Sequence, residues 1–195
     1  MTISRVGIIG SGIMGSGIAE VAAAAGHQVV LRSRSQASAD AMVAGLAKSL
    51  ARQVDKGRLE QAVADEIAGR VSASTELSAL ADCDLIIESV VEDLEVKKAL
   101  FAELDGIVKA GAIIATNTST LAVVEMAMVT KRPELVCGVH FFNPATAMAL
   151  VEIVRPITAS DETIAAVTEF AAKCGKDPVE VKDQAGFIVN ALLFP

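Results

Sequence analysis

The chain has 195 residues, of which 52% are hydrophobic, 21% are charged and 3% are aromatic, and its formal net charge is −7. This length allows one sizeable core with a small annex. No lysine- or arginine-rich face is available to neutralise the phosphates of a duplex, so we expect no nucleic acid partner. Charged residues interrupt every apolar segment, so we expect no membrane span, and Met1 leads into a predicted strand without a signal peptide.

The three cysteines, Cys83, Cys137 and Cys174, are far apart in the sequence. They lack the paired spacing of a zinc site or a redox motif. We therefore predict no metal site, three buried thiols, and a reducing, cytoplasmic compartment.

The chain opens with an apolar, β-branched segment, Ile3 to Gly10, and a buried helix is expected at Ile18 to Ala25. Between them the sequence GSGIMGSG adds Gly12 and Gly15 to the first glycine. In the order strand, tight turn, helix, such glycines allow the turn, the approach of a phosphate and close packing of helix on strand. Small residues also occur in ordinary turns, but these flanks match the required context, so we predict a nucleotide cofactor.

Strand-like and helical patterns alternate along the rest of the chain. Predicted strands cover Gln28–Ser33, Asp84–Ser89, Ala112–Thr116 and Leu135–Phe141, and predicted helices cover Ala37–Lys56, Leu59–Gly69, Leu94–Val108, Thr120–Thr130 and Asp161–Lys173. The first two helices form an excursion longer than a simple crossover requires, and a short segment at Pro178–Val181 could extend the sheet. The alternation predicts an α/β fold with a mostly parallel sheet covered on both faces, and ligands at the carboxyl ends of its strands.

The last ten residues, GFIVNALLFP, begin an apolar helix at Gly186. Exposed apolar clusters usually meet a partner. The helix either packs back on its own sheet or begins a second domain that is otherwise absent, and we favour the second alternative. We therefore expect a dinucleotide-binding domain at residues 1–185 and the start of a helical substrate and dimerisation domain at 186–195. The apolar residues without an obvious covering layer are Phe187, Ile188, Leu192, Leu193 and Phe194.

Two segments at predicted strand ends carry polar chemistry, ATNTST at Ala115–Thr120 and GVHFFNP at Gly138–Pro144. Glu152 follows His140 by twelve residues. A histidine is suited to proton transfer near neutral pH, and a carboxylate on its other nitrogen would fix the tautomer. His140 could instead be a core histidine and Glu152 a solvated edge residue, and the spacing alone does not decide.

The segments GSGIMGSG, TNTS, HFFNP, VEIV and GFIVN together resemble the 3-hydroxyacyl-CoA dehydrogenases, and most closely the short-chain, 3-hydroxybutyryl-CoA type. The resemblance covers nearly the whole chain, and HFFNP placed after TNTS is more specific than the glycine triad. It implies a Rossmann-type NAD-binding domain, an acyl-CoA substrate and a role in fatty acid metabolism. It also implies a second, helical domain that closes over the substrate and forms a homodimer in the full-length protein.

Carried over position by position, the resemblance makes His140 the general base and Glu152 its orienting carboxylate, with Ser119 and Asn190 holding the substrate oxygen. Ser49 and Lys56, together with Ser119, correspond to positions that contact coenzyme A or the acyl-CoA. The implied cofactor contacts are Gly10, Ser11, Gly12, Ile13, Met14, Gly15, Glu92, Lys97, Ser119 and Asn143.

Other interpretations of these residues remain open. Lys56 beside Gly57 suits a helix C-terminus for dipole reasons alone. Glu92 and Lys97 could form an exposed charged face. Ser119 could also cap the following helix.

One departure from the family concerns the cofactor. At the end of the second strand the family usually has an aspartate that bonds the adenosine ribose, but this chain has Ser33 followed by Arg34. An aspartate repels a 2'-phosphate, whereas serine accepts one and arginine can bind it bidentately. Arg32 and Arg34 could simply be solvated. We predict NAD(H) or NADP(H), with NADP(H) slightly favoured.

The implied reaction is reversible: His140 takes the 3-hydroxyl proton while a hydride leaves C3, and the reverse reduces a 3-ketoacyl-CoA. Preorganised donors such as Ser119 and Asn190 can each contribute about 3 kcal/mol to such a transition state. Without a lid domain we expect weak turnover or none from this chain alone. The alternatives are a gulonate-type dehydrogenase of free 3-hydroxyacids and a non-catalytic nucleotide-binding module.

Overall fold

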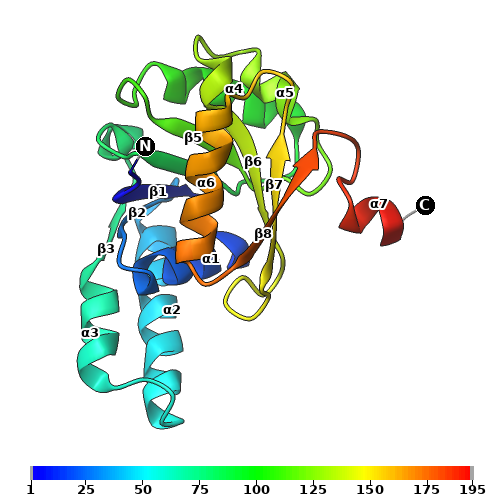
Figure 1. Cartoon of the computed structure of the whole chain (residues 1–195). Helices are drawn as coiled ribbons and strands as arrows, with labels where there is room; N and C mark the ends of the chain where they lie inside the picture. Colours follow the sequence, from blue (N-terminus) through cyan, green and yellow to red (C-terminus); the bar gives the residue numbers. More distant parts are fainter. Residues whose placement is uncertain (1, 194–195) are drawn as a thin grey trace.

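The computed structural model describes residues 2–193 and confirms the predicted α/β class (Figure 1). Its strands form one sheet in the order β3-β2-β1-β4-β5-β6-β7-β8. Neighbouring strands are parallel, except that β6 and β7 are antiparallel. The strands are β1 (Arg5–Ile9), β2 (Gln28–Arg32), β3 (Val71–Ser74), β4 (Leu85–Glu88), β5 (Ile113–Thr116), β6 (Val136–Phe141), β7 (Leu150–Arg155) and β8 (Asp177–Lys182).

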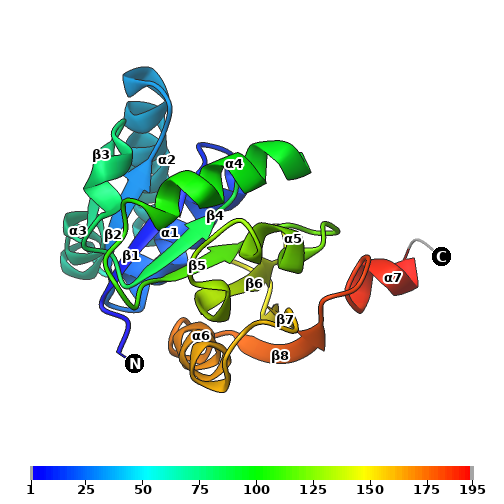
Figure 2. The same ribbon diagram turned by 90° about the horizontal axis from the view of Figure 1, so that it is seen from above.

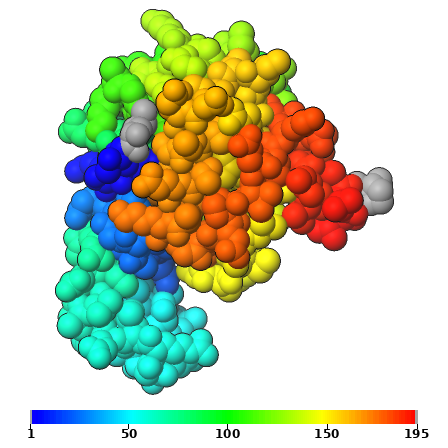
Figure 3. All heavy atoms as spheres, in the orientation of Figure 1, coloured from blue at the N-terminus to red at the C-terminus, as the bar shows by residue number. Residues whose placement is uncertain are grey.

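Helices cover both faces of the sheet. They are α1 (Ile13–Ala24), α2 (Gln36–Asp55), α3 (Gln61–Gly69), α4 (Leu94–Asp105), α5 (Val123–Ala127), α6 (Asp161–Lys173) and α7 (Val189–Leu193), with 3-10 turns η1 (Leu77–Leu80) and η2 (Pro133–Leu135). Seen from above, α4 and α5 lie on one side of the sheet and α6 on the other (Figure 2). The long excursion expected after the second strand is the pair α2 and α3, which projects from the body (Figures 1 and 3).

Successive side chains along each strand point to opposite faces of the sheet, which produces two hydrophobic cores, one on each face. Ile8 of β1 packs with Ile18 of α1 and Phe170 of α6 in the first core. Ile86 of β4 packs with Phe101 of α4 in the second core. Both faces of the central strands are therefore buried, which explains their continuous apolar runs.

The strand order reverses direction between β1 and β4, the feature that defines a doubly wound sheet. From β1 the chain proceeds outward to β2 and β3, and then returns to the other side of β1 as β4. Such a switch point leaves a crevice at the carboxyl ends of the two strands, where ligands bind in this class of fold. The glycine turn after β1 therefore lies at the expected ligand edge.

The predicted helices and strands are confirmed, most of them within three residues at each end, and Pro178–Val181 does extend the sheet as part of β8. The exception is α1, which begins at Ile13 rather than Ile18. Helix α5 is much shorter than the predicted Thr120–Thr130. Two strands were not predicted. β3 has the sequence VSAS, which contains no apolar run, and the strand is only partly buried. β7 contains the VEIV segment, which was quoted only for the family resemblance and was not predicted as a strand.

The C-terminal segment differs from the expectation in one respect. The chain turns at Gly186 and Phe187, whose φ angles are 72° and 51°, so the helix starts only at Val189. Phe187 is 1% exposed and belongs to the second core, so the prediction that it lacks cover was wrong. The predicted apolar exposure holds for Ile188, Leu192 and Leu193, whereas Phe194 lies outside the described residues. Figures 1 and 2 show α7 extending from the body.

Two further expectations concern membranes and thiols. Within residues 2–193, no helix combines the length and the apolar character needed to cross a membrane. Cys83 and Cys137 are buried as predicted, but Cys174 is only partly buried because it borders a surface pocket. Burial raises the pKa of the Cys137 and Cys174 thiols to about 12.

Candidate active site

The glycine turn between β1 and α1 has two kinds of glycine. A Cβ on Gly10 would lie 2.2 Å from the Ser89 carbonyl oxygen, and one on Gly15 would lie 2.2 Å from the Gly10 carbonyl oxygen. These two glycines are thus required by the packing of the chain itself. A Cβ on Gly12, the N-cap of α1, would meet nothing within 4 Å. The helix N-terminus therefore opens onto free space where an anion such as a pyrophosphate fits.

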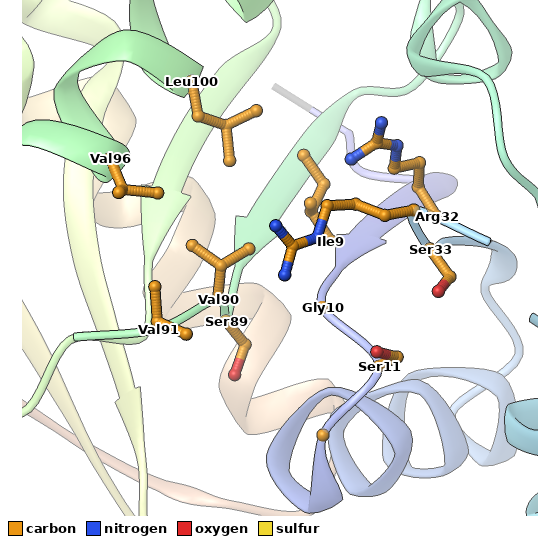
Figure 4. Close-up of a pocket in the computed structure, with 12 residues that line it drawn as sticks. Ile9, Gly10, Ser11, Arg32, Ser33, Ser89, Val90, Val91, Val96 and Leu100 are labelled. Atoms are coloured by element: carbon orange, nitrogen blue, oxygen red, sulfur yellow. The ribbon is translucent and has the colours of Figure 1, made fainter. Parts of the chain in front are cut away.

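A cavity of about 410 Å³ lies on one side of this turn (Figure 4). Gly10 and Ser11 form its rim, and Ser33 stands at the end of β2. The facing wall is apolar and consists of Val90, Val91, Val96 and Leu100. An apolar slot with a few polar groups at its edge suits a flat aromatic ring attached to a polar sugar.

The polar edge of this cavity contains an unpaired group. Ser33 is 3% exposed, and within residues 2–193 its Oγ has no hydrogen-bond partner. Buried hydroxyls normally have a partner, so this one is available to a ligand. Arg34 is exposed and also lines the cavity. Arg32 lines it too, but its Nε donates to the Thr75 carbonyl oxygen at 3.2 Å, so the alternative of two freely solvated arginines is wrong for Arg32.

A second cleft, of about 750 Å³, lies on the other side of the glycine turn. It shares Gly12, Ser89 and Val90 with the first cavity. The two hollows therefore meet at the helix N-terminus, an arrangement that fits a two-part molecule joined by phosphates. The predicted cofactor residues Ile13, Met14, Glu92 and Ser119 line this cleft, together with Asn117 and Thr120.

Lys97 is 1% exposed and lines neither hollow, so the alternative of an exposed charged face is wrong for this residue. Its Nζ lies 2.6 Å from Glu88 Oε1 and 3.4 Å from Glu92 Oε2. Burial opposes ionisation of Glu92, but hydrogen bonds from Thr118 and Ser119 and the charge of Lys97 outweigh it and lower the pKa of Glu92. Glu92 is thus a fixed anionic group at the cleft.

His140 and Glu152 lie side by side on β6 and β7. They are register partners in the antiparallel pair, and His140 Nδ1 lies 2.8 Å from Glu152 Oε2. Both residues are buried, at 4% and 1% exposure, so Glu152 is not a solvated edge residue. A carboxylate only accepts hydrogen bonds, so the proton lies on Nδ1 and Nε2 is left as the basic nitrogen. The rings of Phe142 and Phe187 pack against the imidazole, with centroids 4.5 and 5.6 Å away.

The second oxygen of Glu152 holds the C-terminal segment. Glu152 Oε1 accepts the backbone N–H groups of Ile188 and Val189 at 3.1 and 3.0 Å. In the next residue, Asn190, the side-chain Nδ2 donates to the Ser119 carbonyl oxygen at 3.2 Å. The structure therefore brings together His140, Glu152, Ser119 and Asn190, the four predicted catalytic residues.

Ser119 does not cap the following helix, contrary to the alternative interpretation. Helix α5 begins at Val123, and its N-cap residue is Ala122. The carboxylate of Asp183 accepts the N–H groups of Val123 and Val124 at 2.9 and 2.7 Å, so the N-terminus of α5 is already satisfied by a residue from beyond β8. The hydroxyl of Ser119 is therefore not needed for helix capping.

The two predicted coenzyme A residues lie apart from this cleft. Ser49 and Lys56 line a separate pocket of about 770 Å³. Lys56 is also the C-cap residue of α2, which confirms the helix-end interpretation, whereas its contact with coenzyme A remains a prediction. The pocket is basic: its other charged lining residues are Glu20, Arg52, Arg58, Lys173 and Lys176.

Asn143 is exposed on the loop after β6, and it precedes a cis peptide bond to Pro144. It lines neither of the two hollows at the glycine turn. The loop itself is held by Lys176, whose Nζ donates to the carbonyl oxygens of Ala145 and Met148 at 2.6 and 2.9 Å. The predicted contact of Asn143 with the cofactor remains a prediction.

Several functional candidates were missed from the sequence. Glu88 carried a usable signal, because it is a single charged residue at the end of the apolar strand segment LIIE. Thr118 lies within the TNTST segment but was not singled out. Arg52, Lys173 and Lys176 had no local signal, since α2, α6 and the turn before β8 contribute them from distant parts of the sequence.

Comparisons with known proteins agree with this geometry. The family model described as "3-hydroxyacyl-CoA dehydrogenase, NAD binding domain" matches residues 5–184. A 3-hydroxybutyryl-CoA dehydrogenase of Clostridioides difficile is 44% identical over 98% of this chain and 68% of its own length. The chain thus spans about two thirds of that relative.

Solved structures show the same similarity. FadB2 of M. tuberculosis has a TM-score of 0.96 and 42% identity, covering 99% of this chain and 68% of that one. The (S)-3-hydroxybutyryl-CoA dehydrogenase PaaH1 of Ralstonia eutropha has a TM-score of 0.96 and 40% identity, covering 98% of this chain and 68% of that one.

Proposed function

The chain belongs to the 3-hydroxyacyl-CoA dehydrogenase family of nicotinamide-dependent oxidoreductases, and we propose that its own reaction interconverts short-chain (S)-3-hydroxyacyl-CoA and 3-ketoacyl-CoA. The observation that carries this proposal is the buried His140–Glu152 pair beside Ser119 and Asn190. The glycine turn, the open space at Gly12 and the unpaired Ser33 hydroxyl fit a nicotinamide dinucleotide. When bound, that cofactor would supply the hydride acceptor or donor.

His140 is the proposed general base. Its Nε2 takes the proton of the 3-hydroxyl group as the C3–H bond breaks, and it returns the proton in the reductive direction. Glu152 holds Nδ1–H, so the ring keeps one tautomer and the imidazolium that forms is stabilised. Phe142 and Phe187 limit the access of water to the ring.

Ser119 and Asn190 are the proposed partners of the substrate oxygen. Asn190 Nδ2 has one hydrogen bond to Ser119 O, and its second N–H remains for a ligand. Donors that are already in place when charge develops on the substrate oxygen stabilise the transition state without reorganisation.

For the cofactor we propose that NADP(H) is used, with a slight preference over NAD(H). Ser33 and Arg34 support this proposal, because a buried unpaired hydroxyl and an exposed guanidinium line the same cavity. An arginine beside a serine suits a ribose 2'-phosphate, whereas an aspartate would repel it.

For the substrate we propose that the basic pocket takes the phosphates of coenzyme A. Ser49 and Lys56 line it, and its lining holds five cationic side chains against the single acidic residue Glu20. Such an excess of positive charge favours a polyanionic ligand.

Three further proposals concern the whole protein. Residues 186–193 would lead into a helical domain that closes over the acyl-CoA and forms a homodimer, which the exposed side chains of Leu192 and Leu193 favour. Without such a lid we expect weak turnover. A cytoplasmic location would suit the free thiols at Cys83, Cys137 and Cys174.

The decisive experiment compares acetoacetyl-CoA with free acetoacetate as substrates for the 195-residue chain, with NADPH or NADH consumption as readout at micromolar chain concentration. We expect reduction of the coenzyme A ester only, and a loss of at least 100-fold in His140→Ala. Equal reduction of the free acid would favour a free-hydroxyacid dehydrogenase. Cofactor binding with turnover unaffected by His140→Ala would favour a non-catalytic role.

A binding measurement covers the case of slow turnover. Lys56→Ala should weaken acetoacetyl-CoA binding at least fivefold by calorimetry. Lys131→Ala provides the matched control, since Lys131 is an exposed lysine that lines a different surface hollow. Equal affinity of wild type and Lys56→Ala would place the coenzyme A site elsewhere.

A further inference from the structure

A fully buried carboxylate lies beneath the candidate site, at Glu88. Its Oε1 accepts from Lys97 Nζ and from the Val90 backbone N–H, both at 2.6 Å. Its Oε2 accepts from Thr116 Oγ1 at 2.8 Å. Glu88 lines neither hollow at the glycine turn, so it has no direct access to a ligand there.

Two hydrogen-bonded routes lead from Glu88 to the same short piece of backbone. The first passes through Thr116: its Oγ1 donates to Glu88 and accepts the N–H of Thr118 at 3.1 Å. This route is possible because Glu88 and Thr116 are register partners on β4 and β5.

The second route consists of ion pairs through Lys97. Lys97 bridges Glu88 and Glu92, and Glu92 Oε1 accepts the N–H of Ser119 at 2.8 Å and the hydroxyl of Thr118. Both routes therefore end at two consecutive residues, Thr118 and Ser119.

The charges explain why Glu88 controls the second route. Lys97 is buried, and a buried ammonium needs a close anion. Glu88 supplies this anion at 2.6 Å. Glu92 therefore contacts the ammonium through Oε2 at the longer distance of 3.4 Å, and its Oε1 is free to accept the Ser119 N–H. A buried ion pair adds little net stability compared with apolar packing, but it holds its partners in a defined geometry.

We propose that Glu88 is a positioning residue that fixes the Thr118–Ser119 backbone from outside the cleft. The proposal rests on the proposed function in one respect, namely that Ser119 holds the substrate oxygen. Through Ser119 O and Asn190 Nδ2 the same backbone also sets the place of Asn190. The carboxylate thus orients both proposed oxygen-binding residues without touching the substrate.

The test measures amide hydrogen exchange by NMR in the 195-residue chain. In Glu88→Gln, which keeps the shape but removes the charge, the amides of Thr118 and Ser119 should both exchange at least tenfold faster. In Thr116→Val only the first route is cut, so the Thr118 amide should exchange faster while the Ser119 amide keeps its wild-type rate. This contrast remains available if Glu88→Gln does not fold.

Asp105→Asn is the matched control. Asp105 is also a carboxylate in an ion pair, with a side chain only 7% exposed and Arg132 Nε at 2.7 Å, but it lies at the far end of α4. The Asp105→Asn variant should lower the free energy of unfolding without changing the amide exchange rates of Thr118 or Ser119. Unchanged exchange of both amides in Glu88→Gln, or equal acceleration in Asp105→Asn, would overturn the proposal.

A kinetic readout links the geometry to the reaction. In Glu88→Gln we expect kcat for acetoacetyl-CoA to fall at least fivefold with KM unchanged, because an oriented donor acts mainly in the transition state. Turnover of the wild type is expected to be weak without a lid domain, so failure of the wild type to bind acetoacetyl-CoA would count against the proposed function, whereas the exchange rates would still decide the role of Glu88. A rise in KM with unchanged kcat would contradict the positioning role.

Discussion

His140 and Glu152 are register partners on two antiparallel strands, and their side chains meet at 2.8 Å on the same face of the sheet. Twelve residues separate them in the sequence because the chain must leave β6, form the loop after Pro144 and return as β7. The pair therefore depends on strand pairing, which makes its geometry rigid and its chemistry testable by isosteric substitution.

Glu152→Gln should abolish most of the activity while the chain stays folded. Glutamine can still accept the two backbone N–H groups, but its NH₂ group would face His140 Nδ1 and impose the wrong tautomer. In a Ser-His-Asp catalytic triad, replacement of the aspartate by asparagine imposes the wrong histidine tautomer in the same way, so we expect kcat to fall by about 10³- to 10⁴-fold. Steady-state assays with acetoacetyl-CoA and circular dichroism check the two halves of this prediction. Activity within fivefold of wild type would exclude the tautomer role.

Ser33→Asp should reverse the cofactor preference. The wild type is expected to bind NADPH more tightly than NADH, and the new carboxylate would repel the 2'-phosphate and accept the ribose hydroxyls instead. The ratio of the two dissociation constants should change at least tenfold, as measured by cofactor fluorescence. Arg34→Ala should weaken NADPH binding only. Tighter NADH binding by the wild type, with Arg34→Ala neutral, would exclude a 2'-phosphate site.

Gly12→Ala and Gly15→Ala should separate binding from folding. A methyl group at Gly12 meets no protein atom within 4 Å, so thermal stability should change by less than about 0.5 kcal/mol. The same methyl group would occupy the space proposed for the phosphates, and dinucleotide affinity should fall at least tenfold. At Gly15 the methyl group would lie 2.2 Å from a carbonyl oxygen, which should destabilise the fold by about 2 kcal/mol. Wild-type cofactor affinity in Gly12→Ala would contradict the proposed phosphate position.

Stability should depend on pH through His27. Burial and the nearby charge of Lys173 lower the pKa of His27, outweighing the opposing influences of the Ile3 backbone and of Asp84. The unfolded chain then binds more protons than the folded one below pH 6.5, so the free energy of unfolding falls as the pH decreases, with a slope of up to about 1.4 kcal/mol per pH unit. Urea unfolding between pH 7 and 5.5 measures this slope.

The control for this prediction removes the histidine itself. His27→Phe should remove the slope, because the ring that titrates is then absent. Phenylalanine suits the site, because the His27 ring packs against Phe170 at a centroid distance of 5.1 Å. A slope that persists in His27→Phe would assign the pH dependence to other groups.

Much of the fold could be predicted because its signals are local. The glycine turn after β1 and the alternation of apolar strands with helices each depend on a few consecutive residues. By contrast, the burial of Phe187 depends on a backbone turn at Gly186 and on packing against a distant core, and neither leaves a trace in the local pattern.

The sequence predicted which residues belong to the site, but not which of them contact one another. The sequence placed His140 and Glu152 as candidates, but their contact required the antiparallel return of β7, a strand that was not predicted. The sequence favours a cofactor contact or a surface charge for Lys97; its ammonium is buried against Glu88, which excludes the surface charge and leaves the cofactor contact a prediction. A buried charge is recognisable only once its partners are known, since the pattern of a helix face does not distinguish an ammonium in water from one beside a carboxylate.

The carboxylate of Glu152 divides its two oxygens between the imidazole of His140 and the amides of Ile188 and Val189. A shift of the C-terminal segment away from β7 would break two hydrogen bonds at the same group that aligns the base. The orientation of the His140 ring therefore depends on the position of the segment that leads into α7. A displacement of that segment would change the alignment of the basic nitrogen without any substitution in the site itself.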